Sequence, residues 1–131
     1  MFNKVIQVGR LTQAPELHRS IADKPYIRGT LAVNRRYKDK NGEREADFLP
    51  FVIWGKPAEL MQSYAGKGSL LLMEGELRAR RYEKDGEYRT AVEVLCQHFQ
   101  LLETRAQRES RVEEKNPDLA SLLIAEDDLP F

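Results

Sequence analysis

The sequence predicts an all-β fold, a five-stranded barrel that carries one helix. Five stretches combine β-branched or aromatic residues with alternating polarity, and a helical pattern lies between the third and the fourth. Glycines occur where long strands would have to coil. A sheet of five strands has two open edges, and closure into a barrel removes both of them. The pattern therefore favours a closed barrel of the OB type.

The first half of the chain supplies three of these strands. Residues 4–11 alternate in polarity, whereas residues 12–25 are polar, contain two prolines and are predicted to form a long loop. Residues 26–37 and 45–54 are the second and third strands. An Asn-Gly pair in the connection between them, residues 38–44, is a strong hairpin-turn signal.

Residues 56–65 have the pattern of a helix. Pro57 suits a first helical position, and Gly66 suits the end of the helix. Leu60, Met61 and Tyr64 fall on one side at helical spacing, which supports the helix.

Two further strands follow, residues 70–81 and 87–99, and a turn at Lys84-Asp85-Gly86 separates them. The single cysteine, Cys96, lies among apolar residues of the last strand and is predicted to be buried and reduced.

The charge distribution divides the chain into three parts. Residues 1–105 carry 18 Lys and Arg against 14 Asp and Glu, whereas residues 106–131 carry 3 against 7. We expect a folded domain over residues 1–104, a flexible charged linker over 105–125 and an acidic tip over 126–131 that belongs to a disordered tail. The alternative is a solvated surface with balanced charge.

Several functional classes lack support. Apolar runs are shorter than the roughly 20 residues of a membrane span, and the N-terminus lacks a signal-peptide pattern. We therefore expect a cytoplasmic protein without a membrane partner. His18 and His98 have no partners at metal-ligand spacing, and no nucleophile or phosphate-loop motif occurs, so we expect no enzyme, no catalytic residue, no metal and no cofactor.

Aromatic and basic residues are interleaved in three consecutive strands. The hairpin tip at residues 78–88 carries three arginines with two tyrosines, and basic residues flank aromatic ones elsewhere. Flat rings stack on bases and cations attract phosphates, so the combination is typical of single-stranded nucleic-acid binding. The predicted stacking residues are Tyr37, Phe48, Trp54 and Tyr82, and the arginines predicted beside them to contact phosphate are Arg35, Arg36, Arg78, Arg80 and Arg81. Two alternatives are a solvated hairpin tip and aromatics that fill the core.

The last residues form a second candidate site. An apolar end, Leu129, Pro130 and Phe131, follows Asp127 and Asp128. A partner could take the Phe131 ring in an apolar pocket and bind the terminal carboxylates through Lys or Arg. We therefore expect a protein-docking tip, with a frayed chain end as the alternative.

Several stretches together resemble the bacterial single-stranded DNA-binding proteins. They are Asn3-Lys4-Val5-Ile6, Val8-Gly9-Arg10-Leu11, Leu31-Ala32-Val33-Asn34, Glu45-Ala46-Asp47-Phe48, Trp54-Gly55-Lys56, Lys67-Gly68-Ser69, Glu74-Gly75-Glu76-Leu77-Arg78 and the tail Asp127-Asp128-Leu129-Pro130-Phe131.

The resemblance implies an OB fold and a homotetramer that wraps single-stranded DNA, is associated with the nucleoid and recruits replication, repair and recombination proteins through its tip. It supports the four stacking positions and implies phosphate contacts at Lys40, Lys56, Lys67, Arg80 and Arg81.

The chain also departs from the family pattern. Many members have Trp where Tyr37, Phe48 and Tyr82 stand, and Pro50 replaces a residue that is often polar or basic. The short charged linker is similar to that of the second, competence-associated paralogue of transformable Gram-positive bacteria. An RNA-binding OB module, a tail-based adaptor and a nuclease are the competing hypotheses.

Overall fold

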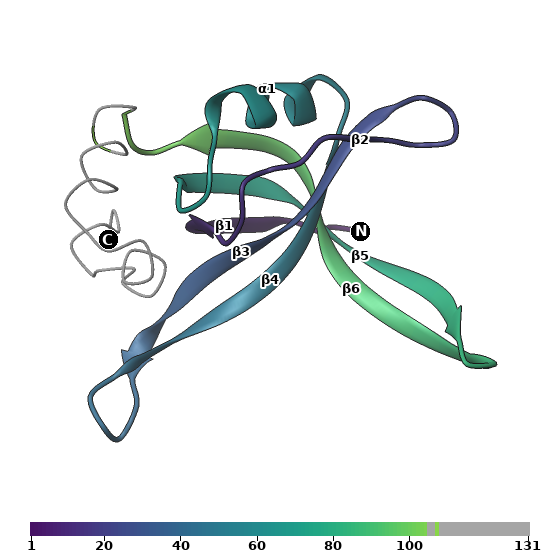
Figure 1. Ribbon diagram of the computed structural model, residues 1–131. Coiled ribbons are helices and arrows are strands. Elements are labelled where there is room, and N and C mark those ends of the chain that lie inside the picture. Colours follow the sequence, from purple (N-terminus) through teal and green to yellow (C-terminus); the bar gives the residue numbers. More distant parts are fainter. Residues whose placement is uncertain (105–106, 108–131) are drawn as a thin grey trace.

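The computed structural model describes residues 1–104 and 107, and these form a closed β-barrel with one helix at its end (Figure 1). The sheet runs in the order β1-β5-β6-β4-β3-β2, and an additional pairing of β1 with β3 closes it. This arrangement confirms the predicted five-stranded barrel with a helix between its third and fourth strands. The elements are β1 (Val5–Leu11), β2 (His18–Arg19), β3 (Pro25–Lys38), β4 (Arg44–Trp54), α1 (Lys56–Tyr64), β5 (Leu70–Lys84) and β6 (Glu87–Leu101).

Strand β2 lies within the segment predicted to be a loop. Its two residues pair with the start of β3, where His18 lies opposite Tyr26 and Arg19 opposite Pro25. A strand of two residues in a polar, proline-containing stretch has no alternation that could reveal it. It adds a sixth strand to the edge of β3 and leaves the five-stranded barrel intact.

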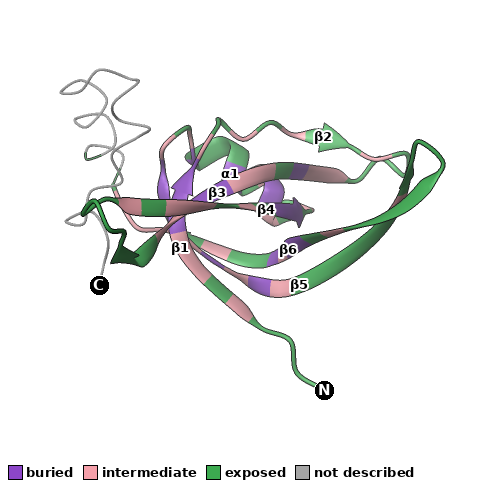
Figure 2. Cartoon of the chain, turned by 90° about the horizontal axis from the view of Figure 1, so that it is seen from below, coloured by how far each residue is buried: buried purple, intermediate pink, exposed green. Residues whose placement is uncertain are grey.

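The barrel interior is filled by alternate residues of its five strands, as the side-chain period of two requires. Ile27, Leu31, Ile53 and Leu71 are almost fully buried, and the purple segments of Figure 2 mark this centre. Cys96 is a free cysteine within the same cluster, as predicted. Its burial raises the pKa of the thiol from 9.0 to about 11, because the low-dielectric interior disfavours the thiolate.

Two glycines are required where strands cross closely. A Cβ on Gly75 would lie 1.9 Å from the carbonyl oxygen of Leu95, and a Cβ on Gly9 would lie 2.3 Å from that of Ala32. The pairing of β5 with β6 also shifts register next to Gly75. Glycine permits these approaches because it has no Cβ, so the strands can coil enough to close the barrel.

Helix α1 covers one end of the barrel with the side that carries Ala58 and Met61. Ala58 and Met61 are fully buried, whereas Leu60 is 40% exposed and Tyr64 is 65% exposed. The small Ala58 side chain lets the helix backbone approach the barrel, and large side chains on the opposite side remain in solvent.

Two hairpins continue beyond the barrel as arms that diverge in Figure 1. We define the β3–β4 arm as residues 34–47 and the β5–β6 arm as residues 77–92; neither contains a buried residue. The second arm ends in a two-residue turn in which Asp85 and Gly86 both have positive φ, 54° and 78°. That geometry matches the twist of the flanking strands, and it confirms the predicted turn.

The last described residues are joined to the barrel. Glu103 accepts a hydrogen bond from the backbone N–H of Leu70 at 3.2 Å, and its other carboxylate oxygen lies 3.4 Å from Arg10, which is buried. Apart from residue 107, the predicted linker and the docking tip lie outside the described residues.

Candidate nucleic-acid interface

Four neighbouring strands present one continuous outward surface. Trp54 lies opposite Tyr26 across β4 and β3, and Phe48 lies on the same side of β4 because six residues separate them. Val52 pairs with Leu95 of β6, and Arg78 of β5 pairs with Glu93, which shares its side of β6 with Leu95. We call this surface of β3, β4, β6 and β5 the four-strand face.

The four-strand face brings together five of the residues predicted from the sequence. They are Phe48, Trp54, Arg78, Arg80 and Tyr82, and all are exposed except Tyr82, which is half-buried. The Phe48 side chain is 66% exposed, so it is available to a ligand and is not part of the core. The alternative in which these aromatics fill the barrel therefore fails for Phe48.

The two neighbouring arginines of β5 point to opposite sides. Arg80 lies 5.6 Å from the centre of the Tyr82 ring, on the four-strand face. Arg81 lies 4.8 Å from the centre of the Tyr88 ring, on the other side of the same arm. Adjacent strand residues alternate in direction, so the structure does not bring Arg81 together with Arg80 and Tyr82.

The β3–β4 arm holds three more predicted residues at a register shift between Asn34 and Lys38. Tyr37 is 83% exposed, and Arg36 is exposed beside it. Arg35 binds two carboxylates, those of Asp47 at 2.9 Å and Glu45 at 3.0 Å. These carboxylates raise the pKa of Arg35, Asp47 most strongly, because they stabilise its charged form. A phosphate would have to compete with both of them.

The three predicted lysines lie outside the strands of the face. Lys40 is exposed in the turn between β3 and β4, where Gly42 donates a hydrogen bond to the backbone carbonyl of Asp39. Lys56 begins α1 with its side chain 77% exposed, 3.9 Å from Glu59, and Lys67 is exposed after the helix. Lys56 follows Trp54 by two residues, so its backbone lies close to that end of the face.

The sequence interpretation missed a column of aromatic rings at the Trp54 end of the face. The Tyr26 ring lies 4.8 Å from the Trp54 ring and 5.7 Å from the His18 ring, with tilted planes in both pairs. A register counted back from the Lys38–Arg44 pair beside the turn would place Tyr26 opposite Lys56. The shift between Asn34 and Lys38 moves the pairing by two residues, so that Tyr26 lies opposite Trp54.

A carboxylate inside the face was also missed. Glu93 is 9% exposed and forms an ion pair with Arg28 at 2.5 Å, and its other oxygen lies 3.9 Å from Arg80. Arg28 and Arg80 belong to strands on opposite sides of β6. Glu93 therefore holds two cations of the face in position, and it partly neutralises both.

Two further features were sought in the part of the chain that the structure describes. Residues 1–104 and 107 contain no group of three or more His, Cys, Asp or Glu that could hold a metal ion. Among the same residues, no helix is long and apolar enough to cross a membrane.

Comparison with known proteins identifies the family. The model of the single-strand binding protein family matches residues 2–102. The chain belongs to this family. The match spans the whole barrel, both arms and every residue of the four-strand face named above, so the face is part of the shared domain.

Relatives of the same family match well beyond the barrel. Single-stranded DNA-binding protein 1 of Streptococcus pyogenes serotype M6 is 56% identical over 131 residues, and Single-stranded DNA-binding protein 2 of Streptococcus agalactiae serotype V is 53% identical over 131 residues; each match covers both chains completely. The Single-stranded DNA-binding protein of Enterococcus faecalis is 48% identical over 112 residues, which are 85% of this chain and 60% of the relative. These two streptococcal relatives thus match from end to end, whereas the Enterococcus faecalis relative extends beyond the match.

Proposed function

We propose that this protein binds single-stranded DNA without sequence preference and coats it. The four-strand face carries the proposal, because it aligns exposed rings with arginines across four strands of the barrel. Stacking on such rings is worth roughly 1–3 kcal/mol per base and tolerates any base. The names of the full-length relatives support DNA as the ligand.

Fluorescence of the single tryptophan, Trp54, tests this proposal directly. Titration with dT oligomers of increasing length at low salt should quench the emission, and added salt should reverse the quenching as counterions compete for the phosphates. Competition between unlabelled poly-dT and poly-U then separates DNA from RNA. Equal or better displacement by poly-U would favour an RNA-binding module, and absence of quenching would favour an adaptor that acts through its tail.

The protein is further proposed to act as a homotetramer. Exposed apolar side chains on β1 and the β5–β6 arm support association, namely Ile6 at 60%, Leu77 at 46% and Val92 at 54% exposure. Sedimentation equilibrium of the full chain, with and without dT oligomers, should give the mass of four copies. A monomer at micromolar concentration would contradict this part of the proposal.

The C-terminal tip is proposed to recruit partner proteins. Its carboxylates and its terminal Phe131 favour capture by a basic, apolar pocket. Deletion of residues 129–131 should abolish partner recruitment and leave DNA affinity unchanged or slightly higher. Recruitment that survives the deletion would contradict the docking role. The proposed settings are replication, recombination, repair and DNA uptake during competence, and the short linker supports the last of these.

A further inference from the structure

One buried carboxylate lies between two cations of the four-strand face. Glu93 is 9% exposed, and its two oxygens lie 2.5 Å from Arg28 of β3 and 3.9 Å from Arg80 of β5. Arg28 is opposite Val52 of β4, and Val52 is opposite Leu95 of β6. The Arg28 side chain must therefore cross β4 to reach Glu93 on β6.

This ion pair covers the centre of the face. Val52 is directed outward, because its neighbours Phe51 and Ile53 fill the barrel interior, and yet it is only 4% exposed. A side chain that crosses β4 at this position accounts for the cover. The Arg28–Glu93 pair therefore lies in the middle of the face, where a bound strand would pass.

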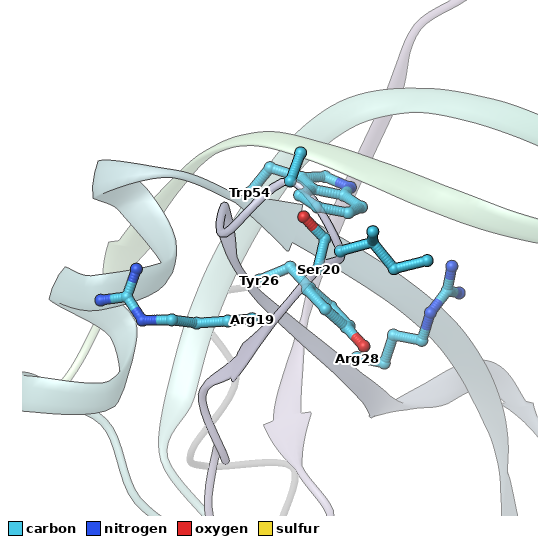
Figure 3. A pocket seen from close by; sticks show the side chains of 7 residues that line it. Arg19, Ser20, Tyr26, Arg28 and Trp54 are labelled. Carbon is cyan, nitrogen blue, oxygen red and sulfur yellow. The ribbon is translucent and has the colours of Figure 1, made fainter.

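A second arginine shows how an exposed ion pair differs. In the pocket beside the Trp54 end of the face, Arg19 and Arg28 extend to opposite sides of the Tyr26 ring (Figure 3). Arg19 lies 3.7 Å from Asp23, whose side chain is 83% exposed. A carboxylate so exposed can rotate into water, and such pairs contribute little.

Burial also distinguishes Glu93 from the carboxylates that hold other predicted DNA-binding arginines. Glu76 beside Arg78 has a side chain that is 24% exposed, and Asp47 beside Arg35 is 43% exposed, whereas the Glu93 side chain is 11% exposed. Salt screens exposed charges strongly and buried charges much less. Glu93 therefore keeps its charge beside its two arginines when a phosphate approaches.

We propose that Glu93 is an anionic competitor built into the four-strand face, which cancels one of the two positive charges that Arg28 and Arg80 offer to the bound strand. The three groups together present one net positive charge. Each phosphate that a protein neutralises releases counterions, so the competitor lowers both the affinity and its dependence on salt. Glu93 thus limits affinity through the two arginines and without contact to DNA. This inference rests on the proposed function, since it concerns the same face.

The alternative is that Glu93 only orients the arginines, so that its loss would weaken binding. Its distance of 3.9 Å from Arg80 is beyond hydrogen-bond range, so it acts on that side chain through charge. A glutamine in place of Glu93 keeps an oxygen that can accept the hydrogen bond from Arg28. Arg28 is also 42% exposed at its side chain, so water can solvate it. Glu93→Gln therefore removes the charge and keeps the orientation.

Glu93→Gln in the full chain tests the proposal, with binding of a dT oligomer followed by Trp54 fluorescence at four or more salt concentrations. The slope of log affinity against log salt should become steeper by about 0.7, the value for one more neutralised phosphate on a single strand. At 0.05 M salt this corresponds to roughly eightfold tighter binding, since the two lines converge near 1 M. An unchanged or shallower slope would overturn the proposal.

Glu83→Gln is the matched control. It removes the same charge from the other side of the β5–β6 arm, where Glu83 lies opposite Tyr88. Its slope should equal that of the wild-type protein. Equal steepening in both variants would be an effect of net charge alone and would contradict a local role for Glu93.

A double substitution supplies a second, independent comparison. Arg28→Gln/Glu93→Gln removes both members of the ion pair, so no buried charge is left without its partner. Arg80 then supplies the one net positive charge, and the slope should equal that of the wild-type protein, whereas Arg28→Gln alone should be shallower by about 0.7. Equal slopes for the double variant and Arg28→Gln would overturn this inference alone. Absence of Trp54 quenching in the wild-type protein would overturn the proposed function as well.

Discussion

The barrel and its two arms are formed by the same strands, yet different forces hold them. Inside the barrel, side chains such as Leu31, Ile53 and Leu71 are completely removed from water. Along the arms, no residue of 34–47 or 77–92 is buried. The arms are held by exposed ion pairs and by the backbone hydrogen bonds of the hairpins. Apolar burial stabilises a fold far more than exposed ion pairs do. The barrel therefore supplies the stability, and the arms are free to carry ligand-binding residues.

This division means that stability and DNA binding should be separable by mutation. The four-strand face begins on the barrel at Trp54 and continues along the β5–β6 arm to Tyr82. A change inside the barrel should destabilise the whole fold, whereas a change on the face should weaken binding alone.

The largest expected effect is on stability, from Phe51→Ala in the barrel interior. Phe51 is 2% exposed, so its truncation should lower the free energy of unfolding by about 3–5 kcal/mol. Tyr37→Ala, in the β3–β4 arm, should change it by less than about 0.5 kcal/mol. Urea denaturation followed by Trp54 fluorescence measures both. Equal losses would contradict the division between barrel and arm.

On the face itself, Phe48→Ala should weaken dT-oligomer binding by about 1–3 kcal/mol through the loss of one stacking ring. The variant keeps Trp54 as the fluorescent reporter, and its urea midpoint should stay close to that of the wild-type protein because Phe48 is largely exposed. Tyr64→Ala on helix α1 is the control, since it removes an exposed ring away from the face. A similar loss in both variants would show that ring position does not matter.

A smaller effect separates the two adjacent arginines. Arg80→Gln should reduce the slope of log affinity against log salt by about 0.7, the value for one lost phosphate contact on a single strand. Arg81→Gln should leave the slope unchanged, because Arg81 lies against Tyr88 on the other side of the arm. Titrations at four or more salt concentrations give both slopes. Equal reductions of the two slopes would mean that the bound DNA contacts both sides of the arm.

The smallest effect concerns thiol chemistry in the barrel. Burial raises the pKa of Cys96 to about 11, so little thiolate is present in the folded protein at pH 8. We expect iodoacetamide to label Cys96 slowly in the folded protein and rapidly after unfolding in urea. The unfolded thiol also loses its proton at lower pH than the folded one, so this group should lower stability as pH rises from 9 to 11. Fast labelling of the native protein would contradict its burial.

Much of the barrel could be predicted because its strands follow local rules. The Asn-Gly and Asp-Gly pairs mark both hairpin turns, and the period-two alternation identifies the strands between them. Helix α1 also lies where predicted, but its pattern does not show which side is buried, since Met61 is buried and Leu60 and Tyr64 are exposed. Ala58 packs closely because its side chain is small, and a hydrophobicity pattern takes no account of side-chain size.

The predicted site was less complete because it depends on register and on pairing between distant strands. The alternation of side chains along a strand places Arg80 and Arg81 on opposite sides, and the sequence alone reveals this. The ion pairs of Glu93 with Arg28 and Arg80 join residues that are far apart in the sequence. Tyr26 was missed because a register shift lies between it and the turn. Such long-range pairings are absent from any single segment of the sequence.

The four-strand face is tested most directly by comparing Tyr82→Ala with Tyr88→Ala in one titration of Trp54 fluorescence with a dT oligomer. Both tyrosines lie on the β5–β6 arm, but alternation and their separate arginine partners place them on opposite sides. Loss of the Tyr82 ring should weaken binding by about 1–3 kcal/mol, and loss of the Tyr88 ring should leave affinity unchanged. Equal losses, or a larger loss from Tyr88→Ala, would contradict a binding surface confined to the four-strand face.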